Sequence, residues 1–250
     1  MTNSRATAAI VGVLFLVATA TFMLAEQLIT GVLNRPDFLG AAGDADTLTA
    51  GALFAFVDGL AVVGIAVILY PLLRHRSETL ALGYVGLRVA ELGVILLYLA
   101  TPLLALAIGG GLRDGTVDAT ASQSLVPLLR ALHDVSIVLV YLFTAVAGGI
   151  LSVALFRSGL VPRALAALGL IGYPVLLAGS ILDMFGGIDV TQGVGMLAVL
   201  PGGLFELILP IWLIARGFRA PVSTDASAIV TRSRLESAAP SATEPMPLAS

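Results

Sequence analysis

Residues 125–151 read LVPLLRALHDVSIVLVYLFTAVAGGIL, an apolar stretch long enough to cross a membrane that nevertheless contains Arg130, His133 and Asp134. On a helix these side chains are one to four residues apart, so we expect them to share roughly one side. Charged groups in hydrocarbon are costly, and they persist where they are paired, protonated or in contact with water. The stretch therefore predicts a membrane-spanning helix facing a polar interior, around which the charges of the other apolar stretches gather.

The composition is that of an integral membrane protein. Of the 250 residues, 58% are hydrophobic and 12% are charged, and the mean hydropathy is +1.02. Soluble domains contain roughly 25% charged residues. This composition, together with long apolar runs, excludes an ordinary soluble domain.

Charge, cysteine content and motifs exclude several classes of function. The formal net charge is −3 and all 13 basic residues are arginines, which provides no basic footprint for nucleic acid. The chain has no cysteine, so disulfides, thiol catalysis and thiolate metal ligands are excluded. There is no P-loop, dinucleotide-binding or nucleophile motif. A zinc site made of His133, Asp58, Asp134 and Glu91 would be too rich in carboxylates, so we expect neither a metal nor a cofactor.

Six apolar segments separated by polar loops predict an all-α, integral membrane bundle of six transmembrane helices. Each segment can cross about 30 Å of hydrocarbon at about 1.5 Å per residue. Ala18-Thr19-Ala20 would fit a signal-peptide cleavage site, but the apolar run before it is too long for a signal core. We therefore interpret it as part of the first span. The expected spans are residues 7–30, 49–73, 79–108, 124–156, 162–185 and 192–218.

The arginines outside the spans predict the orientation. Nine lie on the side of the two termini and two on the opposite side. By the positive-inside rule, both termini are expected in the cytoplasm, with the protein in the inner (plasma) membrane of the cell. Residues 1–219 are expected to form the transmembrane domain. Residues 220–250, rich in Ala, Ser, Thr and Pro, are expected to form a disordered cytoplasmic tail.

Prolines and glycines are expected to interrupt several spans. Pro102, Pro127 and Pro174 should kink or end their helices. The sixth span contains Pro201-Gly202-Gly203, with Glu206 about one turn later. Two interpretations stay open. A helix broken near the midplane exposes carbonyl groups, as at transporter sites; alternatively, the helix is only kinked and Glu206 is hydrogen-bonded.

Carboxylates outnumber cations within the predicted spans. Arg88 and Glu91 are three residues apart and Arg130 and Asp134 four, so each pair can form a salt bridge on one helix. The remaining acids have no arginine left to pair with. They are Asp58, Glu206 and, near external helix ends where they can reach water, Glu26 and Asp183.

Two explanations account for this excess of acids. Polar side chains inside a bundle can bond helices together, at roughly 0.6 kcal/mol per interaction. Alternatively, the unpaired carboxylates are protonated, line a wet cavity or hold a cation. We favour a water-accessible cavity open to the outside. The residues expected to bind a ligand in this buried polar cluster are Asp58, Arg88, Glu91, Arg130, His133, Asp134 and Glu206.

Four stretches are similar to a known family. They are ATAAIVGVLFLVATA (6–20), ETLALGYVGLRVAE (78–91), GLVPRALAALGLIGY (159–173) and FELILPIWLIARGF (205–218). On these stretches the chain resembles a bacterial family of multipass membrane proteins, domain of unknown function four-three-eight-six, over about residues 5–218. The resemblance implies a helical protein of a bacterial inner membrane. It carries over no catalytic residue, but Arg88, Glu91 and Glu206 lie within the similar segments.

Three functions are consistent with the sequence. The first is a small-molecule or proton-coupled carrier; because six helices are few for a transporter, this hypothesis includes a homo-oligomer. The second is a membrane-embedded enzyme acting on a lipid or isoprenoid, with His133 and Asp134 as acid and base and Arg88 or Arg130 holding an anionic head group. The third is a structural or sensing protein. The expected partners are membrane lipids and a small-molecule or ion ligand, with no nucleic acid.

Overall fold

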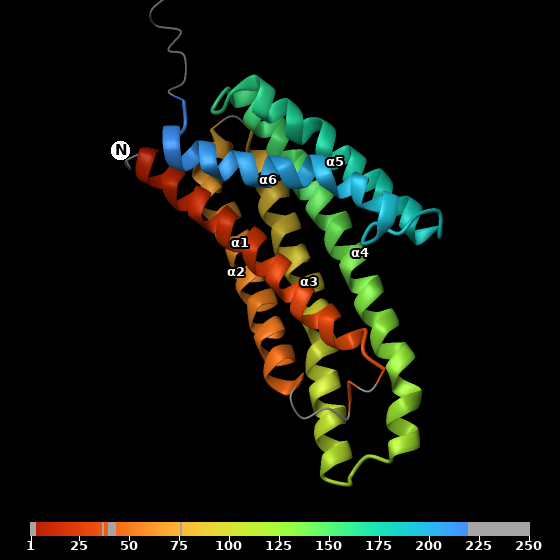
Figure 1. The fold of residues 1–250 in the computed structure, drawn as a ribbon. Coiled ribbons are helices and arrows are strands. Elements are labelled where there is room, and N and C mark those ends of the chain that lie inside the picture. The colour runs from red at the N-terminus through yellow and green to blue at the C-terminus, as the bar shows by residue number, and fades with distance from the viewer. Residues whose placement is uncertain (1–3, 37, 40–43, 76, 220–250) are drawn as a thin grey trace, which may run out of the picture. The chain divides into compact units, whose positions relative to one another are not determined.

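The structure, a computed structural model, describes residues 4–36, 38–39, 44–75 and 77–219, so the expected tail lies outside the described residues. Within these ranges the fold is all-α, without strands, and six helices are long and apolar enough to cross a membrane. The chain is therefore a multipass membrane protein, as its composition predicts. The helices are α1 (Ser4–Leu33), α2 (Ala45–Arg74), α3 (Glu78–Arg113), α4 (Ala119–Ser158), α5 (Arg163–Met184) and α6 (Met196–Arg216) (Figure 1).

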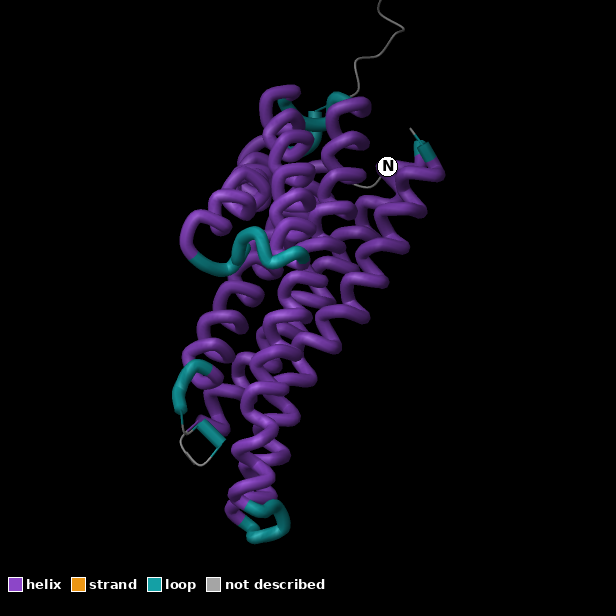
Figure 2. Tube along the Cα trace, turned by 90° about the vertical axis from the view of Figure 1, so that its right-hand side faces the viewer, coloured by secondary structure: helices purple, strands orange, loops and turns teal. Residues whose placement is uncertain are grey.

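The third and fourth helices are longer than a bilayer requires. They contain 36 and 40 residues, which is about 54 and 60 Å at 1.5 Å per residue, against roughly 30 Å of hydrocarbon. Both begin at a side-chain cap: Ser77 Oγ accepts a hydrogen bond from the N–H of Leu80, and Asp118 accepts from Thr120 and Ala121. Figures 1 and 2 show the α3–α4 turn lying well beyond the α5–α6 turn. The α3–α4 hairpin therefore projects past the end of the α5–α6 hairpin.

None of the helices ends at a proline within it. Of the two interpretations of the sixth span, the broken helix is wrong, because α6 runs without interruption from Met196 to Arg216. Glu206 is hydrogen-bonded, by the hydroxyl of Tyr173, as the other interpretation expects.

At Pro201-Gly202-Gly203, α5 packs closely against α6. A Cβ atom on Gly172 would lie 2.6 Å from the backbone N of Gly202 and 2.7 Å from the carbonyl carbon of Pro201. Gly172 and Gly202 therefore allow α5 and α6 to approach each other closely.

The six helices form a ring. Each helix packs against the next one in the sequence, and α6 packs against α1 to close the ring. At the closing contact, a Cβ atom on Gly12 would lie 2.8 Å from both the carbonyl oxygen of Pro210 and Cγ1 of Ile214. Figure 1 shows α6 (blue) meeting α1 (red) near the N-terminal end of α1 and diverging from it toward the α5–α6 turn.

Two clusters of buried apolar residues lie inside the ring, and on α3 the ion-pairing residues Arg88 and Glu91 separate them. One contains Tyr84 and Phe205, and the other contains Ile95 and Tyr98. Along α3, Arg88 and Glu91 follow Tyr84 of the first cluster and precede Ile95 of the second. These two charged residues of α3 therefore lie between the two apolar clusters, within the bundle.

Candidate ligand-binding cavity

A cavity of about 740 Å³ lies inside the helix ring and is lined by all six helices. This volume is in the range of known small-molecule sites, roughly 300–1,000 Å³. Most of the lining is apolar, with few polar groups. The carboxyl and guanidinium side chains that line this space, called the central cavity below, are Glu26, Asp58, Arg88, Glu91 and Glu206.

The predicted pair of Arg88 and Glu91 is formed. Nη1 of Arg88 donates hydrogen bonds of 2.9 and 2.7 Å to the two carboxylate oxygens of Glu91, and both side chains are 2% exposed. Thr144 of α4 donates a 2.6 Å hydrogen bond to the same carboxylate. The guanidinium carbon of Arg88 lies 5.5 Å from the centre of the Tyr84 ring, a cation–π distance. This ion pair is therefore held by two helices, and its charges cancel.

Two further carboxyl groups form no ion pair among the described residues. Glu206 of α6 accepts a 3.2 Å hydrogen bond from the hydroxyl of Tyr173 on α5. Asp58 of α2 is buried, and among the described residues its carboxyl group takes part in no ion pair or hydrogen bond. Both groups line the central cavity. They are consequently the acids most available to a ligand.

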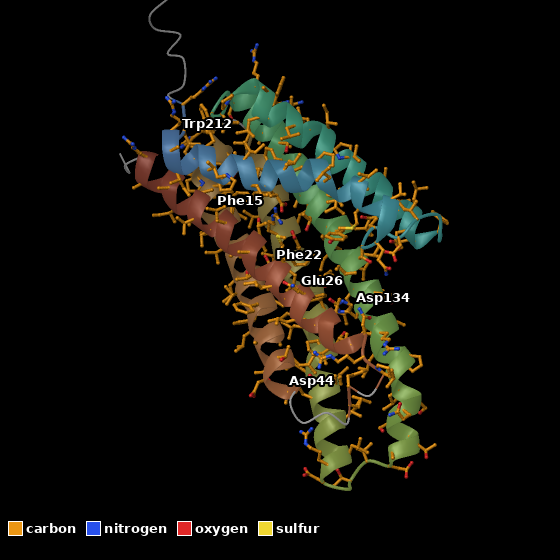
Figure 3. The ribbon with its side chains drawn as sticks, in the orientation of Figure 1. Phe15, Phe22, Glu26, Asp44, Asp134 and Trp212 are labelled. Carbon is orange, nitrogen blue, oxygen red and sulfur yellow. The ribbon has the colours of Figure 1, made fainter. Side chains whose placement is uncertain are left out.

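Glu26 belongs to the cavity, rather than only reaching water at a helix end. Its carboxylate accepts a 2.7 Å hydrogen bond from the hydroxyl of Tyr98. Nε2 of His133 lies 3.4 Å from both of its oxygens, and the His133 and Tyr98 rings are 5.1 Å apart. Phe15, Phe22 and Glu26 follow one another along α1 in Figure 3, and all three line the cavity.

The expectation that Arg130, His133 and Asp134 share one side and join the cluster is wrong in part. Arg130 does not pair with Asp134; its Nε donates a 2.8 Å hydrogen bond to the carbonyl of Leu33, and its Nη2 a 3.1 Å bond to that of Arg35. Leu33 is the last residue of α1, so Arg130 satisfies a carbonyl group that a helix end leaves free.

Successive residues of a helix point about 100° apart, which explains why neighbours on α4 separate. His133 is buried against Glu26, whereas Asp134 lies exposed on the outside of α4 (Figure 3). Arg130, His133 and Asp134 do not line the cavity, whereas Asp58, Arg88, Glu91 and Glu206 do. The acid–base pair of the enzyme hypothesis is therefore not assembled.

Sequence reasoning missed the hydroxyl groups that hold the acids. Tyr98, Thr144 and Tyr173 each donate to a carboxylate on another helix. A buried tyrosine hydroxyl usually has a hydrogen-bond partner, so a tyrosine within an apolar span was a usable signal. The sequence did not indicate which acid each hydroxyl would reach.

The lining favours cationic ligands. Four carboxyl groups and one guanidinium group line the cavity, so the acids outnumber the arginine by three. Within the described ranges, no three His, Asp or Glu side chains are arranged to hold a metal ion. A cation with an organic, partly apolar surface matches both the charge and the walls of this space.

Residues 10–217 match the sequence model of a family described as domain of unknown function (DUF4386). The chain belongs to the DUF4386 family. This confirms the resemblance found in the sequence, and the six apolar helices agree with its multipass character. No curated protein and no solved structure matches the chain significantly. The DUF4386 match covers every residue that lines the central cavity.

Proposed function

We propose that this membrane protein is a carrier that binds a cationic small molecule in the central cavity and exchanges it for protons. The observation that carries the proposal is the balance of charges in the lining, four carboxyl groups against one guanidinium. Because an unpaired carboxylate in a low-dielectric space is unfavourable, a bound cation or a bound proton must neutralise it. Cation and proton therefore compete for the same groups.

The roles of the lining acids follow from their contacts. Glu91 is already neutralised by Arg88 and held by Thr144, so it supports the structure of the site. Within the described part of the chain, Asp58 and Glu206 form no ion pair, and they come from α2 and α6, the two helices that pack against α1. In the proposal these two acids bind the cation, and Glu26 is a third acid nearer the end of α1.

The arginine distribution supports the remaining parts of the proposal. By the positive-inside rule, the proposal puts both termini and residues 220–250 in the cytoplasm and the protein in the plasma membrane. Glu26 and the α5–α6 turn then lie in the outer half of the bundle. A homo-oligomer is part of the proposal because six helices are few for a carrier.

Binding is tested with two probes that differ in charge and hardly in shape, tetraphenylphosphonium and tetraphenylborate. The full-length protein in detergent is expected to bind the cation, to exclude the anion, and to release protons into a weakly buffered solution on binding the cation. Proteoliposomes with a pH gradient are expected to move ethidium, a less permeant cation, faster than protein-free vesicles.

Three variants test the site. Asp58→Asn and Glu206→Gln are each expected to reduce the affinity for tetraphenylphosphonium by about tenfold or more, since a hydrogen-bonded or paired charge contributes roughly 1.5–3 kcal/mol. The control is Asp134→Asn, because Asp134 is exposed and lies outside the cavity lining. Equal affinity for the two probes, or unchanged affinity in both site variants, would overturn the proposal.

A further inference from the structure

The central cavity is open at its side, between α1 and α6. Six apolar residues of α1 and α6 both line the cavity and are exposed, with 43% to 64% of their surface accessible. In a membrane protein, exposure alone indicates only contact with lipid; here the same side chains also border an internal space. We call this rim the α1–α6 opening. Its residues are Met23 and Leu24 of α1 and Met196, Leu200, Leu204 and Leu207 of α6.

The packing of the two helices explains the opening. Gly12 brings α1 against Pro210 and Ile214 of α6 at one end of the pair. From that contact the helices diverge toward the α5–α6 turn (Figure 1). Gly203, which lies within the lining between Leu200 and Leu204, would place a Cβ atom in open space.

The opening lies at the depth of the acyl chains. Helix α6 has 21 residues, about 31 Å along its axis, close to the thickness of the hydrocarbon layer. Leu200 to Leu207 are then about 6 to 17 Å from its first residue, measured along the axis. The only charged residues of α6 are Glu206, which lines the cavity, and Arg216 in the last turn. The rim therefore offers apolar side chains to lipid, with acids behind it.

Resting on the proposed function, we infer that the ligand is a single-chain amphiphile with a cationic head group, which enters from the bilayer through the α1–α6 opening. The head group lies between Asp58 and Glu206, where charge complementarity favours a cation. The alkyl chain passes between the leucines of α6 and the side chains of α1, and its end remains in the lipid. A water-soluble cation without a chain would satisfy the acids and leave the rim without a function.

The test uses alkyltrimethylammonium ions of increasing chain length and the full-length protein in lipid nanodiscs, with empty nanodiscs to subtract partition into lipid. Dodecyltrimethylammonium is expected to displace tetraphenylphosphonium more strongly than the hexyl and methyl homologues, while dodecyl sulfate displaces none. Displacement by all chain lengths with equal affinity would overturn the inference.

The opening itself is tested with Leu204→Trp, which fills the rim. Its control is Ile208→Trp, because Ile208 has nearly the same exposure on α6 and does not line the cavity. In Leu204→Trp, the affinity for dodecyltrimethylammonium relative to tetraphenylphosphonium is expected to fall by about tenfold, the effect of losing about two buried methylene contacts. Ile208→Trp should leave both affinities unchanged.

The outcomes separate the two proposals. If tetraphenylphosphonium does not bind, the proposed function fails and the inference fails with it. If tetraphenylphosphonium binds, but the relative affinity in Leu204→Trp equals that of the wild type, the inference alone is overturned.

Discussion

Gly148 of α4 lies directly against the ring of Tyr173 of α5, so closely that a Cβ atom on Gly148 would be 2.1 Å from Cζ of the tyrosine. The same tyrosine donates its hydroxyl to Glu206. The glycine therefore makes room for the side chain that holds one of the cavity acids, and this contact leads to a first prediction.

Gly148→Ala is expected to destabilise the protein by about 1–3 kcal/mol, the usual cost of overpacking, because the tyrosine ring is buried and must shift. Gly149→Ala is the matched control: its Cβ would lie 3.9 Å from Cβ of Tyr173, which is an ordinary contact. Thermal unfolding in detergent would measure the stability of both variants. Equal stability of the two variants would show that this contact is not tight.

The Arg88–Glu91 pair supports a second prediction. Glu91→Leu leaves the buried guanidinium of Arg88 without its ion-pair partner and is expected to cost about 3–5 kcal/mol. The double variant Arg88→Met with Glu91→Leu removes both charges, and it is expected to recover most of that loss because well-packed apolar residues replace buried ion pairs at little cost. The recovery is measured by comparing the unfolding midpoints of the single and the double variant. A double variant as unstable as the single one would contradict this account.

Tyr98 supports a third prediction. Its hydroxyl is buried in the bundle and donates a 2.7 Å hydrogen bond to Glu26. Tyr98→Phe is expected to cost about 1.5–3 kcal/mol, since the acceptor is a carboxylate. Tyr141→Phe is the control because, among the described residues, no partner donates to or accepts from its hydroxyl. A loss of stability in Tyr141→Phe as large as in Tyr98→Phe would show that the hydrogen bond to Glu26 is unimportant.

Local features of the sequence were sufficient to predict the six helices and one ion pair. A span depends on the length and hydropathy of one run, and the Arg88–Glu91 pair depends on a spacing within one helix. The contacts of Arg130 and Tyr98 could not be predicted in this way. Their partners Leu33 and Glu26 are 97 and 72 residues away in the sequence. Which helix faces which is decided by the packing of the whole ring.

The contacts of the glycines could not be predicted from the local sequence either. Gly148 packs against Tyr173, and a Cβ atom on Gly59 would lie 2.6 Å from Leu92. On Gly86 and Gly93 a Cβ atom would meet nothing within 4 Å. Lipid and a neighbouring helix are both apolar, so the sequence around a glycine does not distinguish a face that meets lipid from a face that meets protein.

The orientation of the bundle can be tested because the chain has no cysteine, so a single introduced thiol can be labelled without background. His75 follows α2 and Asp114 follows α3, and both side chains are exposed. Nine arginines lie on the side of His75 and both termini, which predicts that this side faces the cytoplasm. In intact cells a membrane-impermeant maleimide is therefore expected to label Asp114→Cys and not His75→Cys, and His75→Cys should become reactive once the membrane is permeabilised. The reverse pattern would place both termini outside and would move the α1–α6 opening and its acids to the cytoplasmic half of the membrane.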